Sequence, residues 1–95
     1  MKKHYEPIVC EDGFTMSVQA SAMNYSYPRT DAGPYSQVEI GYPSQEESLL
    51  IDWAEDPGDP TGTVYGWVPS NVVWDVILKH GGVTKGELPP LVMGE

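Results

Sequence analysis

The chain has 95 residues, of which 14 are acidic and five are Lys or Arg, giving a formal net charge of −9. This length allows a single domain, residues 1–95, with one modest core. Because nucleic-acid affinity comes mainly from Lys and Arg displacing counterions, we expect no direct binding to DNA or RNA. No apolar run approaches the roughly 20 residues of a membrane-spanning helix, and no apolar run follows the first lysines. We therefore expect neither membrane association nor a secretory signal.

The only cysteine, Cys10, cannot form an internal disulfide and has no Cys or His neighbour at metal-binding spacing. A single thiol of this kind fits a reducing compartment. We therefore expect the protein to remain in the cytoplasm.

The first predicted element is a strand over residues 14–20, preceded by a turn at Glu11-Asp12-Gly13. Four apolar residues alternate there with polar ones, which is typical of a half-buried strand: Phe14, Met16, Val18 and Ala20. Residues 1–7 are expected to be flexible. Residues 21–36 are rich in Asn, Ser, Pro, Gly and Asp and predict a long loop. A second strand is expected over residues 37–42, with Val38, Ile40 and Tyr42 facing the core.

Residues 44–55 allow two interpretations. The segment Ser44-Gln45-Glu46-Glu47 matches a capping box and would begin a helix through Trp53. Alternation of Leu49, Ile51 and Trp53 instead indicates a strand. The breaker at residues 56–62 and a strand at residues 63–68 favour a hairpin, with Tyr65 and Trp67 on the face opposite Val64 and Val68.

Residues 70–80 predict a helix, capped by Ser70 or Asn71 and ended by Gly81-Gly82. Its core stripe would contain Val72, Val73, Val76, Ile77 and His80. Trp74 and Leu78 fall on another side. An extended Pro-rich tail, residues 83–95, would cover them by folding back, and the alternative is self-association with a second copy of the chain.

These elements predict an α+β fold: a three- to four-stranded antiparallel meander with one C-terminal helix packed on one face. We expect a monomer or a homodimer.

The sequence contains no pattern that is typical of a catalytic site. The two histidines are His4, near the N-terminus, and His80, at a helix end where a structural role is favoured. No nucleophile motif, paired CxxC or phosphate loop occurs. We therefore expect no enzyme activity, no catalytic residue, no metal and no cofactor. The carboxylates of Asp52, Glu55, Asp56 and Asp59 could hold Ca²⁺, but their spacing matches no EF-hand and a solvated acidic turn is favoured.

Two groups of residues are candidates for binding a partner. Tyr and Arg dominate protein-binding hot spots, and the contact residues would be Tyr25, Tyr27, Arg29, Tyr35, Tyr65 and Trp67. An acidic surface would attract a partner with a basic surface and would contain Glu46, Glu47, Asp52, Glu55, Asp56 and Asp59. The alternatives are that the tyrosines extend a thin core and that the acidic residues only aid solubility.

Several segments together resemble a family of small phage and prophage proteins of unassigned function. They are residues 12–21, Tyr27-Pro28-Arg29, Gly33-Pro34-Tyr35, residues 38–44, residues 64–69 and His80-Gly81-Gly82. The resemblance implies a phage-encoded protein in the cytoplasm of a bacterial host. It favours a non-catalytic binding protein that inhibits a host protein, such as a component of an antiphage defence. One alternative is a protein that binds or sequesters a nucleotide, with the base stacked on Tyr65, Trp67 or the loop tyrosines and the phosphate contacted by Arg29 and His80. The other alternative is an accessory virion protein.

Overall fold

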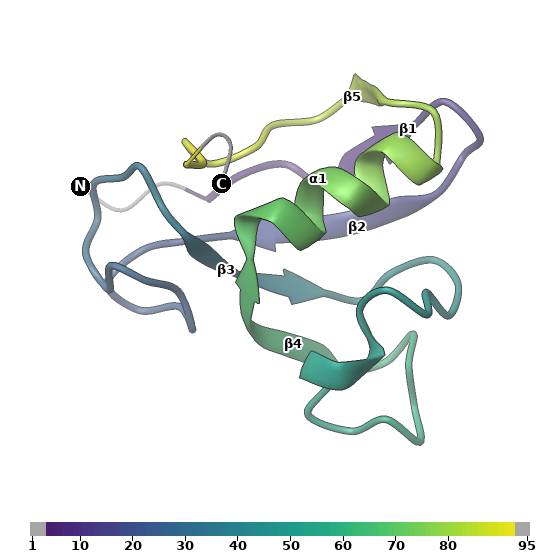
Figure 1. Ribbon diagram of the computed structural model, residues 1–95, viewed down its shortest axis with the longest axis horizontal. Helices are drawn as coiled ribbons and strands as arrows, with labels where there is room; N and C mark the ends of the chain where they lie inside the picture. Colours follow the sequence, from purple (N-terminus) through teal and green to yellow (C-terminus); the bar gives the residue numbers. More distant parts are fainter. Residues whose placement is uncertain (1–3, 93–95) are drawn as a thin grey trace.

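The computed structural model describes residues 4–92, which form an antiparallel sheet with one α-helix across one face (Figure 1). The strands are β1 (Ile8–Cys10), β2 (Thr15–Gln19), β3 (Gln37–Gly41), β4 (Val64–Pro69) and β5 (Val83–Lys85). The helix is α1 (Ser70–Lys79), and a short 3-10 helix, η1 (Ile51–Trp53), precedes β4. None of the helices within this part of the chain is long and apolar enough to cross a bilayer.

The sheet has the strand order β4-β3-β2-β1-β5, so the first four strands form a meander and β5 returns to pair with β1. The predicted α+β class, the meander and the C-terminal helix are confirmed. The sequence did not indicate β1 and β5, because strands of three residues are too short to show alternation. β5 lies at the start of the predicted tail, and beyond it Leu91 bridges to Tyr35. The prediction for residues 93–95 lies outside the described residues.

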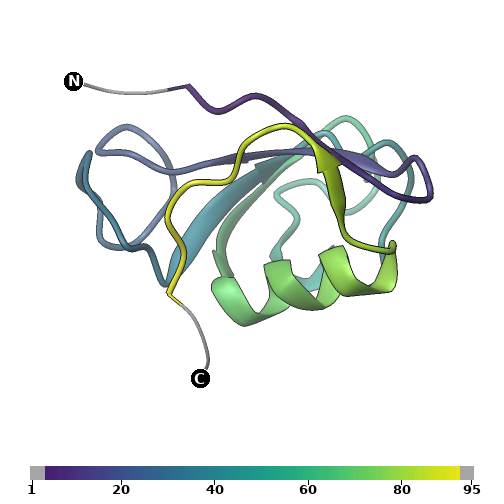
Figure 2. The same cartoon turned by 90° about the horizontal axis from the view of Figure 1, so that it is seen from above.

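One face of the sheet forms the core with α1. The alternation in and around β2 places Phe14, Met16, Val18 and Ala20 inside, as predicted. Figure 2 shows α1 on one side of the sheet and the N-terminal segment on the other. The opposite face carries the intervening residues, all polar except the glycine, and we call it the open face: Thr15, Ser17, Gln19, Gln37, Glu39 and Gly41.

A bulge in β4 corrects the predicted orientation of its side chains. Val38 pairs with Val68 and Ile40 pairs with Tyr65, so Glu39 alone faces both Gly66 and Trp67. The extra residue reverses the alternation. Tyr65 and Val68 therefore both enter the core, whereas Trp67 points outward with 46% of its surface exposed.

The prediction that residues 44–55 supply a strand that pairs with residues 63–68 in a β-hairpin is wrong, and so is the alternative of a helix starting at the capping box. The segment consists of turns and η1, with a single bridge from Ala54 to Tyr65. The physical reason is the side chain of Glu47, which is 1% exposed and accepts a hydrogen bond from the Leu49 N–H at 3.0 Å. A side chain that bonds its own backbone competes with regular structure. Tyr42, predicted to face the core, is instead exposed and has a φ of 51°, which ends β3.

The α1 helix follows the predicted stripe, with Val73, Val76 and Ile77 buried and Val72 partly buried. The predicted side-chain cap is wrong, because Pro69 occupies the N-cap position and no side chain bonds there. Trp74 is partly buried against the core, as are Leu88 and Leu91, whereas Leu78 is exposed. Self-association through Trp74 and Leu78 stays a prediction.

Candidate functional site

An exposed stack of aromatic rings lies where the long loop between β2 and β3 meets the edge strand β4. The rings of Tyr25 and Trp67 are stacked with their centroids 4.7 Å apart, and the Arg29 guanidinium carbon lies 5.6 Å from the Tyr25 ring centroid. The Trp67 N–H donates to the Tyr25 carbonyl at 3.0 Å. We call Tyr25, Arg29 and Trp67 the aromatic platform. Two segments 42 positions apart in the chain (67 − 25) are thereby joined at the surface.

The backbone at Trp67 is held in an unfavourable conformation. Its φ of 53° lies in the left-handed region, which a bulky residue rarely adopts and which costs on the order of 1–3 kcal/mol. The bulge in β4 and the hydrogen bond to Tyr25 hold it there. Conformations of this kind are concentrated at functional sites, and here the consequence is an outward-facing indole.

The loop that carries the platform is anchored to the open face of the sheet. The Glu39 carboxylate accepts hydrogen bonds through Oε1 from the Tyr25 N–H at 2.9 Å and from Asn24 Nδ2 at 3.4 Å. Buried Ser26 donates to the Ser21 carbonyl at 3.1 Å. The platform therefore rests on a fixed segment of a loop without regular secondary structure.

The structure separates the predicted contact residues into two groups. Tyr27 is 63% exposed and Arg29 is exposed, so both are accessible together with Trp67. Tyr35 and Tyr65 are fully buried, and their assignment as contact residues is wrong. Each tyrosine hydroxyl donates to a backbone carbonyl five positions away, Tyr35 to Thr30 at 2.9 Å and Tyr65 to Pro60 at 2.6 Å. For these two residues the inward-folding alternative is correct.

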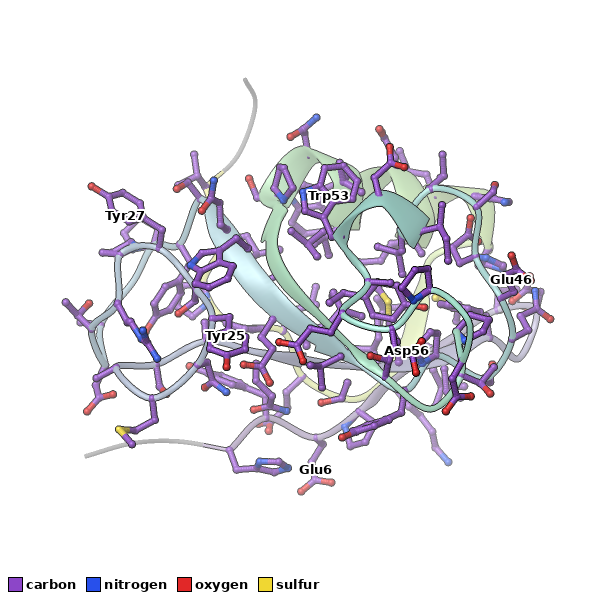
Figure 3. All side chains as sticks on the ribbon, turned by 90° about the horizontal axis from the view of Figure 1, so that it is seen from below. Glu6, Tyr25, Tyr27, Glu46, Trp53 and Asp56 are labelled. Carbon is purple, nitrogen blue, oxygen red and sulfur yellow. The ribbon has the colours of Figure 1, made fainter. Side chains whose placement is uncertain are left out.

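Five of the six predicted acidic-surface residues are exposed on the connection between β3 and β4: Glu46, Asp52, Glu55, Asp56 and Asp59. Figure 3 shows Tyr27 and Glu46 at opposite ends of the molecule, with Tyr25 and Asp56 between them. Of these acidic residues, Glu46 thus lies at the far end of the molecule from Tyr27, and Asp56 lies nearer the middle. Within residues 4–92 no group of His, Cys, Asp or Glu side chains is arranged to hold a metal ion.

Glu47, the sixth predicted surface acid, is buried in a charged cluster, so its assignment to the acidic surface is wrong. Its Oε1 lies 2.6 Å from His80 Nε2, and its Oε2 accepts from Lys79 Nζ at 2.8 Å. The other ring nitrogen of His80, Nδ1, lies 2.6 Å from Asp12 Oδ2. The Phe14 ring stacks on the imidazole with centroids 4.1 Å apart. We call Asp12, Glu47, Lys79 and His80 the His80 cluster.

The protonation states in the His80 cluster follow from these contacts. Burial would lower the pKa of His80, but hydrogen bonds to Glu47 and Asp12 outweigh it and raise the pKa above its ordinary value. Burial opposes ionisation of Glu47, yet hydrogen bonds from the Leu49 N–H, Lys79 and His80 lower its pKa. The backbone N–H of Phe14, followed by His80, lowers the pKa of Asp12. An ionised carboxylate only accepts hydrogen bonds, so a carboxylate on each ring nitrogen favours the doubly protonated form of His80.

This arrangement links three segments of the fold and does not suit general-base catalysis. A general base needs a free ring nitrogen within reach of a substrate, whereas both nitrogens of His80 are occupied and the residue is 4% exposed. The same saturation removes His80 as a phosphate donor. The cluster joins the β1–β2 turn, the β3–β4 connection and the C-terminal end of α1, where a cation is also favoured by the helix dipole.

A cleft of about 250 Å³ opens on the open face of the sheet beside the platform. Among residues 4–92, neither a lysine nor an arginine lines it. Its walls come from the N-terminal segment, β2, the loop, β3 and β4, and are formed by His4, Ser17, Gln19, Asn24, Glu39, Gly41, Tyr42 and Val64. No local pattern in the sequence indicates this cleft, because its walls come from five separate segments.

No family model matches the chain, and neither a curated protein nor a solved structure matches it significantly.

Proposed function

We propose that this protein acts without catalysis, by binding another protein through the aromatic platform and Tyr27. The observation that carries the proposal is the platform itself, in which an indole, a phenol ring and a guanidinium are stacked at the surface. Trp, Tyr and Arg are the residues most enriched among those that dominate binding energy. Tyr27, 63% exposed, adds a further aromatic contact beside them.

The accessibility of the Arg29 guanidinium supports the proposal. Within residues 4–92 its guanidinium makes no ion pair, although the chain has an excess of acidic residues. It is therefore accessible to a carboxylate or an aromatic ring of a partner. Arginine offers five donors in a planar fork, which suits recognition of this kind.

The partner we propose is a bacterial host protein with a basic surface, for example a component of an antiphage defence. This chain, as a phage-encoded protein, would inhibit that partner by binding to it. The exposed acidic residues of the β3–β4 connection would accelerate the encounter by long-range attraction. Glu46 lies at the far end of the molecule from Tyr27, so we assign the acidic residues to steering and assign the contacts to the platform.

Affinity capture from bacterial lysate tests this proposal, with the tagged chain compared with its Trp67→Ala and Arg29→Ala variants. Loss of a hot-spot residue costs about 2 kcal/mol or more, so we expect retention of the partner to fall at least about 30-fold. Lys85→Ala, which removes an exposed cation on β5, is the matched control for Arg29. The association rate should also fall as salt rises. Equal capture by the wild type and both platform variants would refute the proposal.

The cleft gives some support to a second candidate function, the sequestering of a small ligand. The lining that residues 4–92 provide includes the Glu39 carboxylate and no lysine or arginine, so it suits a cation better than a nucleotide phosphate. Melting scans against a nucleotide panel distinguish the two functions, because a tight ligand raises the melting midpoint.

A further inference from the structure

We propose that the cleft on the open face receives a basic side chain, lysine or arginine, of the partner protein, with Glu39 as its counter-ion. The inference rests on the proposed function and specifies what the partner must present. It assigns a second anchor point beside the aromatic platform, with the opposite charge to that of Arg29.

The carboxylate of Glu39 has acceptor capacity left for a ligand. Its Oε1 accepts from Tyr25 and Asn24, which fixes the side chain against β3. Its Oε2 makes no hydrogen bond to any residue within 4–92. An ionised carboxylate offers about four lone-pair sites, so a charged donor can bind without displacing the loop. Charge-assisted bonds of this kind are roughly twice as strong as neutral ones.

The walls of the cleft fit the rest of a basic side chain. Tyr42 is 60% exposed and its φ of 51° turns it away from the core, so its ring is available for a cation–π contact. Val64 and Gly41 offer an apolar surface to the methylene stem, as lysine and arginine stems require.

The cleft is held in shape before a partner arrives. The Gln19 side chain accepts from the Tyr5 N–H at 3.0 Å and donates to the Tyr5 carbonyl at 2.6 Å, which fixes the N-terminal segment to β2. Ser17 Oγ accepts a third bond from Gln19 at 3.1 Å. A preformed site avoids the entropic cost of ordering its walls on binding.

The cleft and the platform belong to one continuous surface. Asn24 lines the cleft and Tyr25, its neighbour in the chain, forms the platform, and Glu39 bonds to both. A partner that stacks on Trp67 therefore has a carboxylate within reach on the open face. We expect the partner surface to present a lysine or arginine to the cleft and, beside it, aromatic or acidic residues to the platform.

A titration with small probes tests the cleft independently of any partner. N-acetyl-arginine amide and N-acetyl-lysine amide are added to the ¹⁵N-labelled chain, with N-acetyl-citrulline amide as the uncharged isostere of arginine. We expect amide shifts at Gly41, Tyr42 and Val64, with a Kd on the order of 10 mM for a single charged contact, and at least about tenfold weaker binding of citrulline. The relative affinity of the arginine and lysine probes identifies which side chain the cleft prefers.

Two variants complete the test. Glu39→Gln keeps an acceptor oxygen for Tyr25 and removes the charge, and should weaken arginine binding about tenfold; Glu55→Gln, an equal charge change on the β3–β4 connection, should leave it unchanged. Tyr42→Ala, outside the core, should weaken it severalfold. Equal shifts with citrulline, or identical titrations of the wild type and both cleft variants, would overturn the inference. Capture of a partner that depends on Trp67 but not on Glu39 would overturn it too, and would leave the proposed function intact.

Discussion

Replacing Glu47 with alanine should remove a large part of the stability of the protein. The carboxylate is 1% exposed and accepts bonds from His80, Lys79 and the Leu49 N–H, so the variant leaves a buried imidazolium facing only Asp12. Removing one partner of a buried ion pair costs about 3–5 kcal/mol. A chain of 95 residues has roughly 5–14 kcal/mol in total. The loss is therefore about a fifth or more of the stability.

Urea unfolding followed by tryptophan fluorescence measures this loss. With a slope of about 1.5 kcal/mol per molar, the midpoint should fall by roughly 2–3 M without a change in slope. Glu46→Ala is the matched control, since its carboxylate is exposed, and should change the free energy of unfolding by less than about 0.5 kcal/mol.

Two further variants separate the contributions of charge and of individual partners. Glu47→Gln keeps an acceptor oxygen and should lose about 1–2 kcal/mol. Lys79→Ala should lose less than about 1 kcal/mol, because the lysine side chain is 48% exposed. If Glu47→Ala and Glu46→Ala had midpoints within about 0.3 M of each other, the buried ion pair would not stabilise the fold and the reasoning would be refuted.

Three other predictions concern titration, hydrogen bonding and thiol reactivity. Because the pKa of His80 is raised, its contribution to stability is complete below about pH 6.5 and is lost as pH rises through the folded-state pKa. Because the pKa values of Asp12 and Glu47 are lowered, their contribution is complete above about pH 4 and is lost as pH falls. Urea midpoints measured from pH 3 to 10 should therefore form a plateau between about pH 4.5 and 6.5 and decline on both sides, and a flat profile would contradict this. Tyr65→Phe removes the 2.6 Å bond to Pro60 and should cost about 1–2 kcal/mol by the same urea assay, whereas no loss would indicate that the bond is not formed. Burial, together with the nearby charge of Asp12, raises the pKa of the Cys10 thiol. Alkylation of the folded chain at pH 8 should therefore be slower than alkylation of the urea-unfolded chain. Equal rates would show that the thiol is accessible.

Local patterns predicted the elements whose side chains repeat at a regular spacing. Alternation around β2 gave its buried face, and the stripe of α1 gave Val73, Val76 and Ile77. The β4 bulge could not be read in this way, since an extra residue shows only when the partner strand's register is known. The alternating pattern therefore assigned Tyr65 to the same face as Trp67, although the bulge places the two on opposite faces.

The sites depend on long-range contacts and were less accessible from the sequence. Glu47 and His80 are 33 positions apart, and Asp12 and His80 are 68 apart, so no motif links them. Glu47 appeared solvated because Gln45, Glu46 and Ser48 around it are polar. The loop tyrosines were predicted as contact residues from residue type alone, and residue type cannot distinguish exposed Tyr27 from buried Tyr35.

The order of the strands has a consequence for synthesis of the chain on the ribosome. The meander β1–β4 is complete at Pro69, but the helix that covers its apolar face follows afterwards, and β5 reaches its place beside β1 only after that. Until roughly twenty more residues have emerged, the nascent sheet exposes its hydrophobic side and the edge of its first strand, which is the condition under which chains associate wrongly. We expect folding to be completed only after α1 and β5 have emerged, and a chain truncated at residue 69 to aggregate.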